Sequence, residues 1–439
     1  MNAPRLVPSL THGLSFNDLY DRNGLGRVDA VFAAWLLNID AGVHARLMAA
    51  RAAPDQFAAK DESNLLIELA RPLEDFIGTL FGVASPVAEL RGRHNRLAPL
   101  YDCKRLFVQR YVTRAIKPDV AAALDGDSVT AAIAAYVDFA ALAAGNLEGG
   151  ELAFALAVGD LVGAEFKVDK PTPEIEALAR YAAWALHNPD GKKRHRDGPL
   201  FKVPHKLDPE HLVPIETEIV DGVTRMKLPR PLLRHREGFA LTDGGFDLVR
   251  ALDHTNYCIW CHNQGKDSCS RGLKDRKTGA FQKSPFGVTL AGCPLEEKIS
   301  EMNLLKSEGF SIGALAMAVV DNPLVAATGH RICNDCMKAC IYQKQEPVDI
   351  PQIETRTLKD VLDLPWGFEI YSLLTRWNPL NLRRPIPRPA TGRTVLVVGL
   401  GPAGFNLSHH LMNDGHAVVA IDGLKIEPLP PEQSGVLAD

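Results

Sequence analysis

Seven of the eight cysteines lie between Tyr257 and Glu354. They form two groups of three, with the spacings Cys-x2-Cys-x7-Cys and Cys-x2-Cys-x3-Cys, and one cysteine between the groups is followed by proline. In chain order they are Cys258, Cys261, Cys269, Cys293, Cys333, Cys336 and Cys340. A CxxC pair in one tight turn brings two sulfurs close enough to share a metal centre. The pattern therefore predicts a metal or cluster site.

Three chemistries can use such a set of thiols. The chain opens with no apolar signal segment, so the thiols are expected in a reducing cytosol and disulfides are disfavoured. Structural zinc usually takes four Cys or His in paired knuckles, which these groups match poorly without excluding it. Iron–sulfur clusters favour three cysteines plus a remote one, often followed by proline as in Cys293-Pro294. Clusters are the better fit, and zinc stays open.

Short motifs around the cysteines carry a resemblance to a known family. They are Gly292-Cys293-Pro294-Leu295, Lys298-Ile299, Glu301-Met302-Asn303, Asn322-Pro323-Leu324, Thr328-Gly329 and the run from Pro347 to Glu354. The segment from about Asp253 to Asp422 resembles the helical iron–sulfur domain and the start of the flavin domain in the small (beta) subunit of glutamate synthase. It also resembles the N-terminal part of dihydropyrimidine dehydrogenase. This family is an FAD-dependent pyridine nucleotide oxidoreductase with two [4Fe–4S] clusters.

The resemblance implies a ligand set for each cluster. One cluster would be bound by Cys258, Cys261, Cys269 and Cys340, and the other by Cys293, Cys333, Cys336 and the carboxylate of Glu354. The sequence departs from the family pattern in three places. Cys269 follows its CxxC pair at a longer gap, a basic insert runs from Ser270 to Ala291, and the second triplet is one residue tighter.

A second motif lies near the end of the chain. Thr394 to Val398 is an apolar run typical of a buried parallel strand, and a glycine-rich turn, a helix and a second strand from Ala417 to Ile421 follow it. The predicted dinucleotide-binding residues are Gly399, Gly401, Pro402, Ala403, Gly404 and Asp422. Glycines there allow a tight turn, close approach of the backbone to a pyrophosphate and close helix–strand packing, while the acidic residue binds a ribose. In the resembling family this unit binds FAD.

Composition excludes some classes of partner. A formal charge of −4 gives no basic field for nucleic acid. The longest apolar runs, 129–144 and 152–164, are too short and too interrupted by aspartate to cross a membrane. We therefore expect a cytoplasmic protein that binds neither nucleic acid nor membrane.

The fold class expected is mainly α. Residues 1–180 predict a helical N-terminal region of unknown role, and residues 181–242 a proline-rich surface connector with a β-hairpin at Asp221-Gly222. Residues 243–388 would form an α-helical iron–sulfur domain. Residues 389–439 would form a partial Rossmann-type βαβ unit for FAD or NAD(P).

The resemblance implies an NAD(P)H-dependent FAD and iron–sulfur oxidoreductase that relays electrons, with no catalytic acid or base in this chain. The FAD site is expected to be incomplete here, through truncation, gene splitting or incomplete sequence, because too few residues follow Asp422 to complete a flavin domain. The expected partners are the missing flavin and NAD(P)H portion, or a subunit that carries it, and an electron acceptor. The alternative is a non-catalytic, zinc-stapled helical scaffold.

Overall fold

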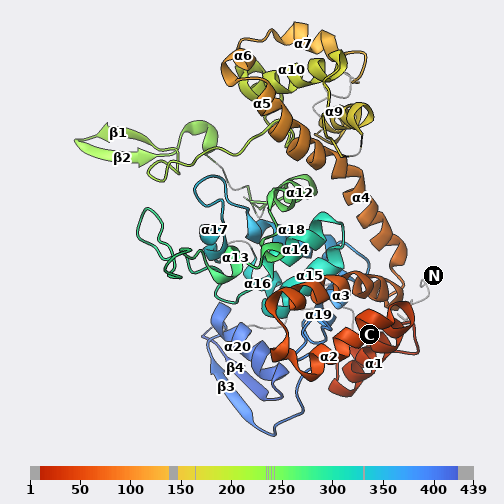
Figure 1. The fold of residues 1–439 in the computed structure, drawn as a ribbon. Helices are drawn as coiled ribbons and strands as arrows, with labels where there is room; N and C mark the ends of the chain where they lie inside the picture. Colours follow the sequence, from red (N-terminus) through yellow and green to blue (C-terminus); the bar gives the residue numbers. More distant parts are fainter. Residues whose placement is uncertain are drawn as a thin grey trace, which may run out of the picture. The chain divides into compact units, whose positions relative to one another are not determined.

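The computed structural model describes residues 10–137, 147–163, 165–233, 235, 237–238, 240–241, 243–329 and 332–423. Contacts divide the chain into two compact units, one of Met1–Pro54 with Ser372–Asp439 and one of Asp55–Tyr371. We describe each unit by itself. Helices dominate both units, and the sheets of the described residues are two-stranded, so the mainly α prediction is confirmed (Figure 1). None of the described helices is long and apolar enough to cross a membrane.

The first unit is built on an N-terminal helical pair. Its elements are the 3-10 helix η1 (Phe16–Leu19), α1 (Arg22–Ile39) and α2 (Ala41–Ala52). The Asp21 carboxylate caps α1, because it accepts hydrogen bonds from the first backbone N–H groups of the helix. The indole of Trp377 packs edge-on against Phe32 and donates to the Asp29 carboxylate at 3.0 Å. The N-terminal helices and the segment after Ser372 thus share one core.

A strand–helix–strand motif completes the first unit. Strands β3 (Thr394–Val398) and β4 (Ala417–Ile421) are parallel, and α20 (Pro402–Asn413) connects them. This order and these bounds confirm the predicted β–turn–α–β pattern. Residues 424–439, the end of the expected partial unit, lie outside the described residues.

The second unit begins with the long helices α3 and α4 and contains a core rich in aromatic side chains. Its first elements are η2 (Pro54–Gln56, which begins at the unit boundary), α3 (Ala59–Leu80), α4 (Ala84–Asp102), the π-helix η3 (Cys103–Val112), α5 (Thr113–Ala115), α6 (Pro118–Ala122), α7 (Gly126–Ile133) and α9 (Leu147–Val162). Phe107, Phe154, Tyr181 and Trp184 are buried together there. Cys103 is fully buried in the same core, far along the chain from the other cysteines.

The prediction that residues 181–242 form a connector is wrong for the first part of that range. Residues 173–194 form α10 (Pro173–His187) and α11 (Pro189–Arg194), so helix α10 runs through residue 181. Pro173 and Pro189 lie in the first turns of these two helices, where the missing N–H of proline is tolerated. The hairpin prediction is confirmed, since β1 (Glu216–Val220) pairs antiparallel with β2 (Val223–Lys227). A one-turn 3-10 helix η4 (Arg230–Leu232) follows.

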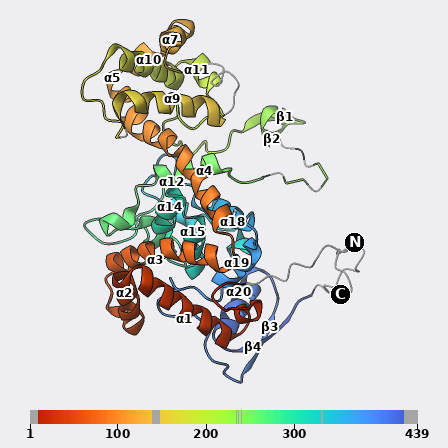
Figure 2. The ribbon, with the colours of Figure 1, turned by 90° about the vertical axis from the view of Figure 1, so that its right-hand side faces the viewer.

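The rest of the second unit is a helical scaffold around the cysteines (Figures 1 and 2). Its elements are α12 (Leu248–Tyr257), η5 (Cys261–Gln264), α13 (Ser268–Arg271), α14 (Ile299–Ser307), α15 (Ser311–Asp321), α16 (Val325–Thr328), α17 (Asp335–Ala339) and α18 (Ile350–Leu362), with α19 (Gly367–Leu374) reaching past the unit boundary. Helix α15 is buried along almost its whole length between α3, α14 and α18. The carboxylate of Glu74 on α3 accepts hydrogen bonds from Ile312 N and Gly313 N, which ties α3 to the start of α15.

Candidate functional site

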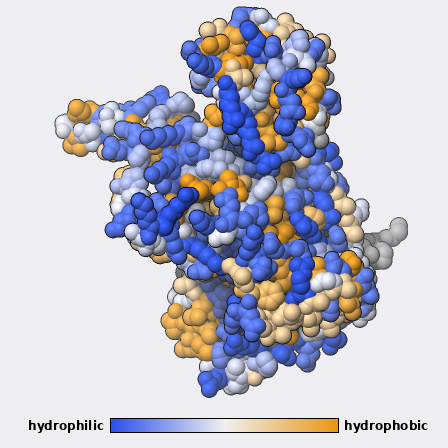
Figure 3. Space-filling view, in the orientation of Figure 1, coloured by the Kyte–Doolittle hydropathy of each residue, from blue (hydrophilic) through white to orange (hydrophobic). Residues whose placement is uncertain are grey.

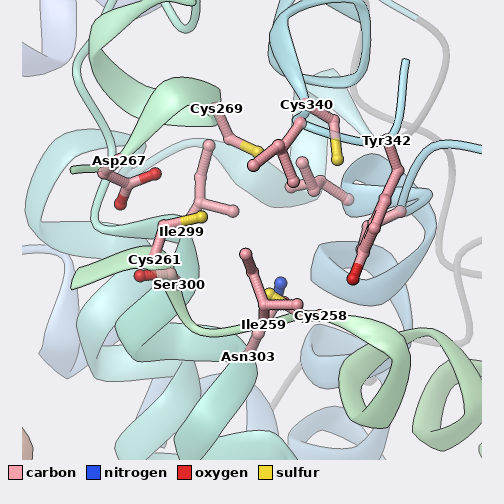
Figure 4. A pocket seen from close by; sticks show the side chains of 13 residues that line it. Cys258, Ile259, Cys261, Asp267, Cys269, Ile299, Ser300, Asn303, Cys340 and Tyr342 are labelled. Atoms are coloured by element: carbon pink, nitrogen blue, oxygen red, sulfur yellow. The ribbon is translucent and has the colours of Figure 1, made fainter. Parts of the chain in front are cut away.

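Four of the predicted ligands face one common space. Cys258 follows the end of α12, Cys261 starts η5, Cys269 lies in α13 and Cys340 follows α17. Their side chains line one common space (Figure 4). The structure therefore brings together the four cysteines that the resemblance assigns to one cluster, although 71 positions separate Cys269 from Cys340.

Tight turns orient the sulfurs of both CxxC pairs. Trp260 has a left-handed backbone, with φ of 50°, and its N–H donates to the Cys258 sulfur at 3.4 Å. In the second pair, Asp335 N donates to the Cys333 sulfur at 3.5 Å. Such N–H groups stabilise negative charge on sulfur, so both turns are suited to hold thiolates.

The walls of this space are largely apolar. They comprise Ile259, Ile299, Ile341, Val348 and Ile350, together with the ring of Tyr342. The amide of Asn303 also lines the space, and this fully buried side chain forms a hydrogen bond with Cys258 that lowers the pKa of that thiol. A hydrogen bond to sulfur stabilises negative charge on it. Asn303 is therefore placed to stabilise a thiolate at Cys258.

Burial and one hydrogen bond between two of the cysteines control the protonation of the four thiols. It raises the pKa of Cys258 to about 11 and that of Cys261 to about 12. The thiol of Cys269 donates a hydrogen bond to Cys340, which raises the pKa of Cys269 and lowers the pKa of Cys340 to about 7. Most of these groups therefore keep their protons at neutral pH until a cation replaces them.

The single cysteine between the two triplets lies beside the first site. Cys293 N donates to the backbone oxygen of Cys269 at 2.8 Å. Gly292 makes this approach possible, because its φ is 83° and an added Cβ would lie 2.5 Å from Gly272 N. The basic insert before it is folded as two short antiparallel bridges, Lys274 to Phe281 and Lys283 to Thr289.

The second predicted ligand set gathers around Glu354 on α18. The charge of Glu354 acts on Cys293 and Cys336, and the charge of Cys333 acts on Glu354. Burial raises the pKa of Cys293 to about 11 and also raises the pKa of Cys336. These four residues are therefore electrostatic neighbours.

At this second set Glu354 is paired with a second carboxyl group, that of Glu297, which the sequence did not single out. Burial raises the pKa of Glu297 to about 7. Burial and then the charge of Glu297 raise the pKa of Glu354, and the protonated Glu354 donates a hydrogen bond to Glu297. A cation bound at Glu354 would displace this shared proton.

Two further polar residues near the first set were also missed by sequence reasoning. Asp267 caps α13, and burial and then the charge of Glu301 raise its pKa to about 6. Asn303 was only part of a quoted motif. Nothing in their local sequence distinguishes them from surface polar residues, since their role depends on the folded contacts of α13 and α14.

Across the described ranges, no three His, Cys, Asp or Glu side chains come close enough together to hold a single metal ion.

The glycine-rich turn lies in the other unit, between β3 and α20. An added Cβ at Gly404 would lie 1.8 Å from Gly399 O, so this glycine is required where α20 crosses the turn. At Gly401, the N-cap of α20, the same atom would meet nothing within 4 Å, which leaves open space at the helix N-terminus. Pro402 and Ala403 form the first turn of α20. The Asp422 carboxylate, after β4, accepts from Leu400 N at 2.5 Å.

Comparison with known proteins gives one family match. A model described as the RP005 N-terminal alpha-helical domain matches residues 10–82. The Rickettsia prowazekii protein named Uncharacterized protein RP005 is 29% identical over 313 residues, which cover 68% of this chain and 98% of RP005. The mainly helical character of the N-terminal part thus agrees with the description of that family.

Two other relatives match shorter segments. Uncharacterized protein RP006 of Rickettsia prowazekii is 66% identical over 106 residues, or 24% of this chain and 15% of RP006. The protein named Glutamate synthase [NADPH] small chain of Mycobacterium tuberculosis is 34% identical over 132 residues, or 30% of this chain and 24% of that protein. The chain is thus a distant homologue of the glutamate synthase small chain over part of its length, and its match spans only a minor part of these two relatives.

Proposed function

We propose that this chain is an electron-transfer component of a flavin and iron–sulfur oxidoreductase similar to the glutamate synthase small chain. One observation carries the proposal: four cysteines from separate segments line a single space in a helical scaffold, and a second set lies beside them. The proposed ligands are Cys258, Cys261, Cys269 and Cys340 for one [4Fe–4S] cluster and Cys293, Cys333, Cys336 and Glu354 for the other.

The residues present fit such a group. The four sulfurs line one space with largely apolar walls, and the buried amide of Asn303 forms a hydrogen bond with Cys258 that lowers the pKa of this thiol. Backbone N–H groups already donate to one sulfur of each CxxC pair. When bound, such clusters supply one-electron transfer.

The chain's own residues would set the conditions for that transfer. Ile299, Val348 and Ile350 border the first space and would exclude water from it. Low solvent access and hydrogen bonds to sulfur are two of the protein's means of setting a cluster's potential. At the second site, Glu354 would supply an oxygen ligand, and Glu297 would accept its hydrogen bond whenever the metal is lost.

We assign the strand–turn–helix–strand motif as the pyrophosphate-binding start of an FAD domain. The open space at Gly401 and the helix N-terminus behind it suit a phosphate anion. Asp422 lies at the same turn, where the ribose of a dinucleotide is bound in Rossmann-type units. NADPH as the electron donor is part of the proposal, because the Mycobacterium relative is named for it.

The partner we propose is the remainder of a flavin fold, whether on the same polypeptide or on another subunit. Helix α20 covers one face of the sheet, and the other face is apolar and exposed, as the orange surface over β3 and β4 indicates (Figure 3). Its residues are Leu396, Val398, Val419 and Ile421, which are 59%, 75%, 51% and 48% exposed. Parallel sheets are normally covered on both faces, so further elements of the fold would bury this one.

Electron uptake tests the proposed function. Protein purified without oxygen should be brown, with broad absorption near about 400 nm, and dithionite should produce a paramagnetic signal that disappears on reoxidation. The alternative of a zinc-stapled scaffold predicts colourless protein with stoichiometric zinc and no signal after dithionite. That second result would overturn the proposal.

A further inference from the structure

An open cavity of about 420 Å³ lies in the second unit, apart from the space between the cysteines. Its walls come from η3, residues 202–204 and 207, α12 with Phe246 before it, Met337 of α17 and the loop before α18. Cavities of this size bind small organic molecules, in which apolar surfaces hold the body and a few polar groups fix the orientation. Both kinds of group are present here.

Two cations border this cavity without acidic partners. Three acids also line the cavity: Asp253 is paired with Lys104 at 2.6 Å, the Asp349 carboxylate caps α18 through Gln352 N, and the Glu346 carboxylate lies 3.3 Å from His205 Nδ1. Within the described part of the chain, by contrast, the side chains of Arg250 and Lys202 form no ion pair. Both are exposed and line the cavity, so they are available to an anion.

Aromatic rings supply flat apolar surface. The ring of Phe246 lies 4.9 Å from that of His254. His254 Nδ1 accepts a hydrogen bond from Asp349 N, and burial lowers the pKa of the ring, so it is neutral near pH 7. Tyr257 also lines this side of the cavity, and its side chain is uncharged. A planar ring can pack against these surfaces.

A stacked pair of tyrosines lies between the cavity and the first cysteine site. Tyr257 lines the cavity, and its ring stacks on Tyr342 with centroids 4.5 Å apart and planes 18° from parallel. Tyr342 in turn lines the space between Cys258, Cys261 and Cys340 (Figure 4). A molecule in the cavity would therefore lie close to that site.

We propose that this cavity binds a planar aromatic molecule that carries an anionic group, in addition to the two clusters and FAD. Arg250 and Lys202 pair with the anion, and the ring packs against Phe246 and Tyr257. The binding itself does not require iron. The position of the cavity beside Tyr342 suits a redox-active heterocycle. The redox role of the bound molecule rests on the proposed function.

Two planar aromatic anions, flavin mononucleotide and an anthraquinone sulfonate, test the site by calorimetric titration of the intact chain. Both should bind saturably. The double variant Arg250→Ala and Lys202→Ala should weaken both by about tenfold or more, because each lost charge-assisted contact removes a substantial part of the binding. Riboflavin, which lacks the phosphate, should bind equally to the wild type and to this variant.

Matched variants separate this cavity from other sites. Lys206→Ala, on the same extended segment but outside the cavity, should leave binding unchanged. Phe246→Ala should weaken binding of flavin mononucleotide and riboflavin alike, and its backbone hydrogen bond to Gln352 is retained. Gly401→Ala should not change the affinity of the cavity, and it detects any flavin mononucleotide that binds at the dinucleotide turn instead.

Absence of saturable binding by both anions would overturn the inference, as would flavin mononucleotide binding that is lost in Gly401→Ala and kept in the double variant. If the protein contains no clusters but still binds both anions at Arg250 and Lys202, the proposed electron-transfer role is contradicted and the cavity assignment is supported. The two failures are therefore distinguishable.

Discussion

Replacement of Cys340 by serine should remove one of the two proposed clusters and leave the other. Cys340 shares its space with Cys258, Cys261 and Cys269, whereas Cys293 and Cys336 are neighbours of Glu354. The iron content of protein prepared without oxygen should therefore fall from about eight to about four atoms per chain. Iron analysis with the paramagnetic spectrum of the remaining cluster measures this.

Two matched variants define the result. Glu354→Ala should disturb the complementary cluster, built on Cys293, Cys333 and Cys336. Cys103→Ser changes the one cysteine that is buried in the aromatic core, and it should leave the iron content unchanged. Equal loss of both clusters in Cys340→Ser and Glu354→Ala would contradict the division of ligands between two sites.

Replacement of Lys306 by methionine should destabilise the second unit by roughly 3–5 kcal/mol, the usual cost of removing one partner of a buried ion pair. Lys306 is completely buried on α14 and donates to the Asp360 carboxylate on α18 and to Ser311 Oγ. Burial lowers the pKa of Lys306. Burial also opposes the ionisation of Asp360, but the positive charges of Lys306 and Arg356 outweigh it, so the pKa of Asp360 is lowered. Urea denaturation of the wild type and the variant gives the difference in the free energy of unfolding.

Two further variants show whether the buried charge is the cause. Lys167→Ala removes an exposed lysine paired with Asp169 and should leave the urea midpoint where it is. The double variant Lys306→Met and Asp360→Leu removes both buried charges, and Arg356 keeps the exposed Asp363 as a partner. It should be more stable than Lys306→Met alone. If the double variant is less stable than the single one, packing and not charge explains the effect.

The sequence predicts the local parts of this molecule well because their signals are local. The Asp221-Gly222 hairpin and the order of strand, glycine turn, helix and strand from Thr394 to Ile421 are confirmed at nearly the predicted bounds. Spacing alone cannot say that Cys269 and Cys340 face the same space, since that depends on how α13 packs against α17. The resemblance to a known family supplied the grouping.

Other features depend on tertiary context. The proline at position 189 lies in the expected connector, but it begins helix α11, and the apolar face of the preceding helix α10 is buried with Tyr181 and Trp184. Glu297 and Asp267 look like ordinary surface acids in the sequence. Only burial beside the cysteines changes their pKa values and gives them a place at the sites.

The most direct test of the two-cluster assignment is the content of iron, acid-labile sulfide and zinc in the intact, oxygen-protected chain. We predict about eight irons and about eight sulfides per chain, with zinc absent from the cysteine sites. Stoichiometric zinc without sulfide would contradict the assignment and leave a metal-stabilised helical scaffold in its place.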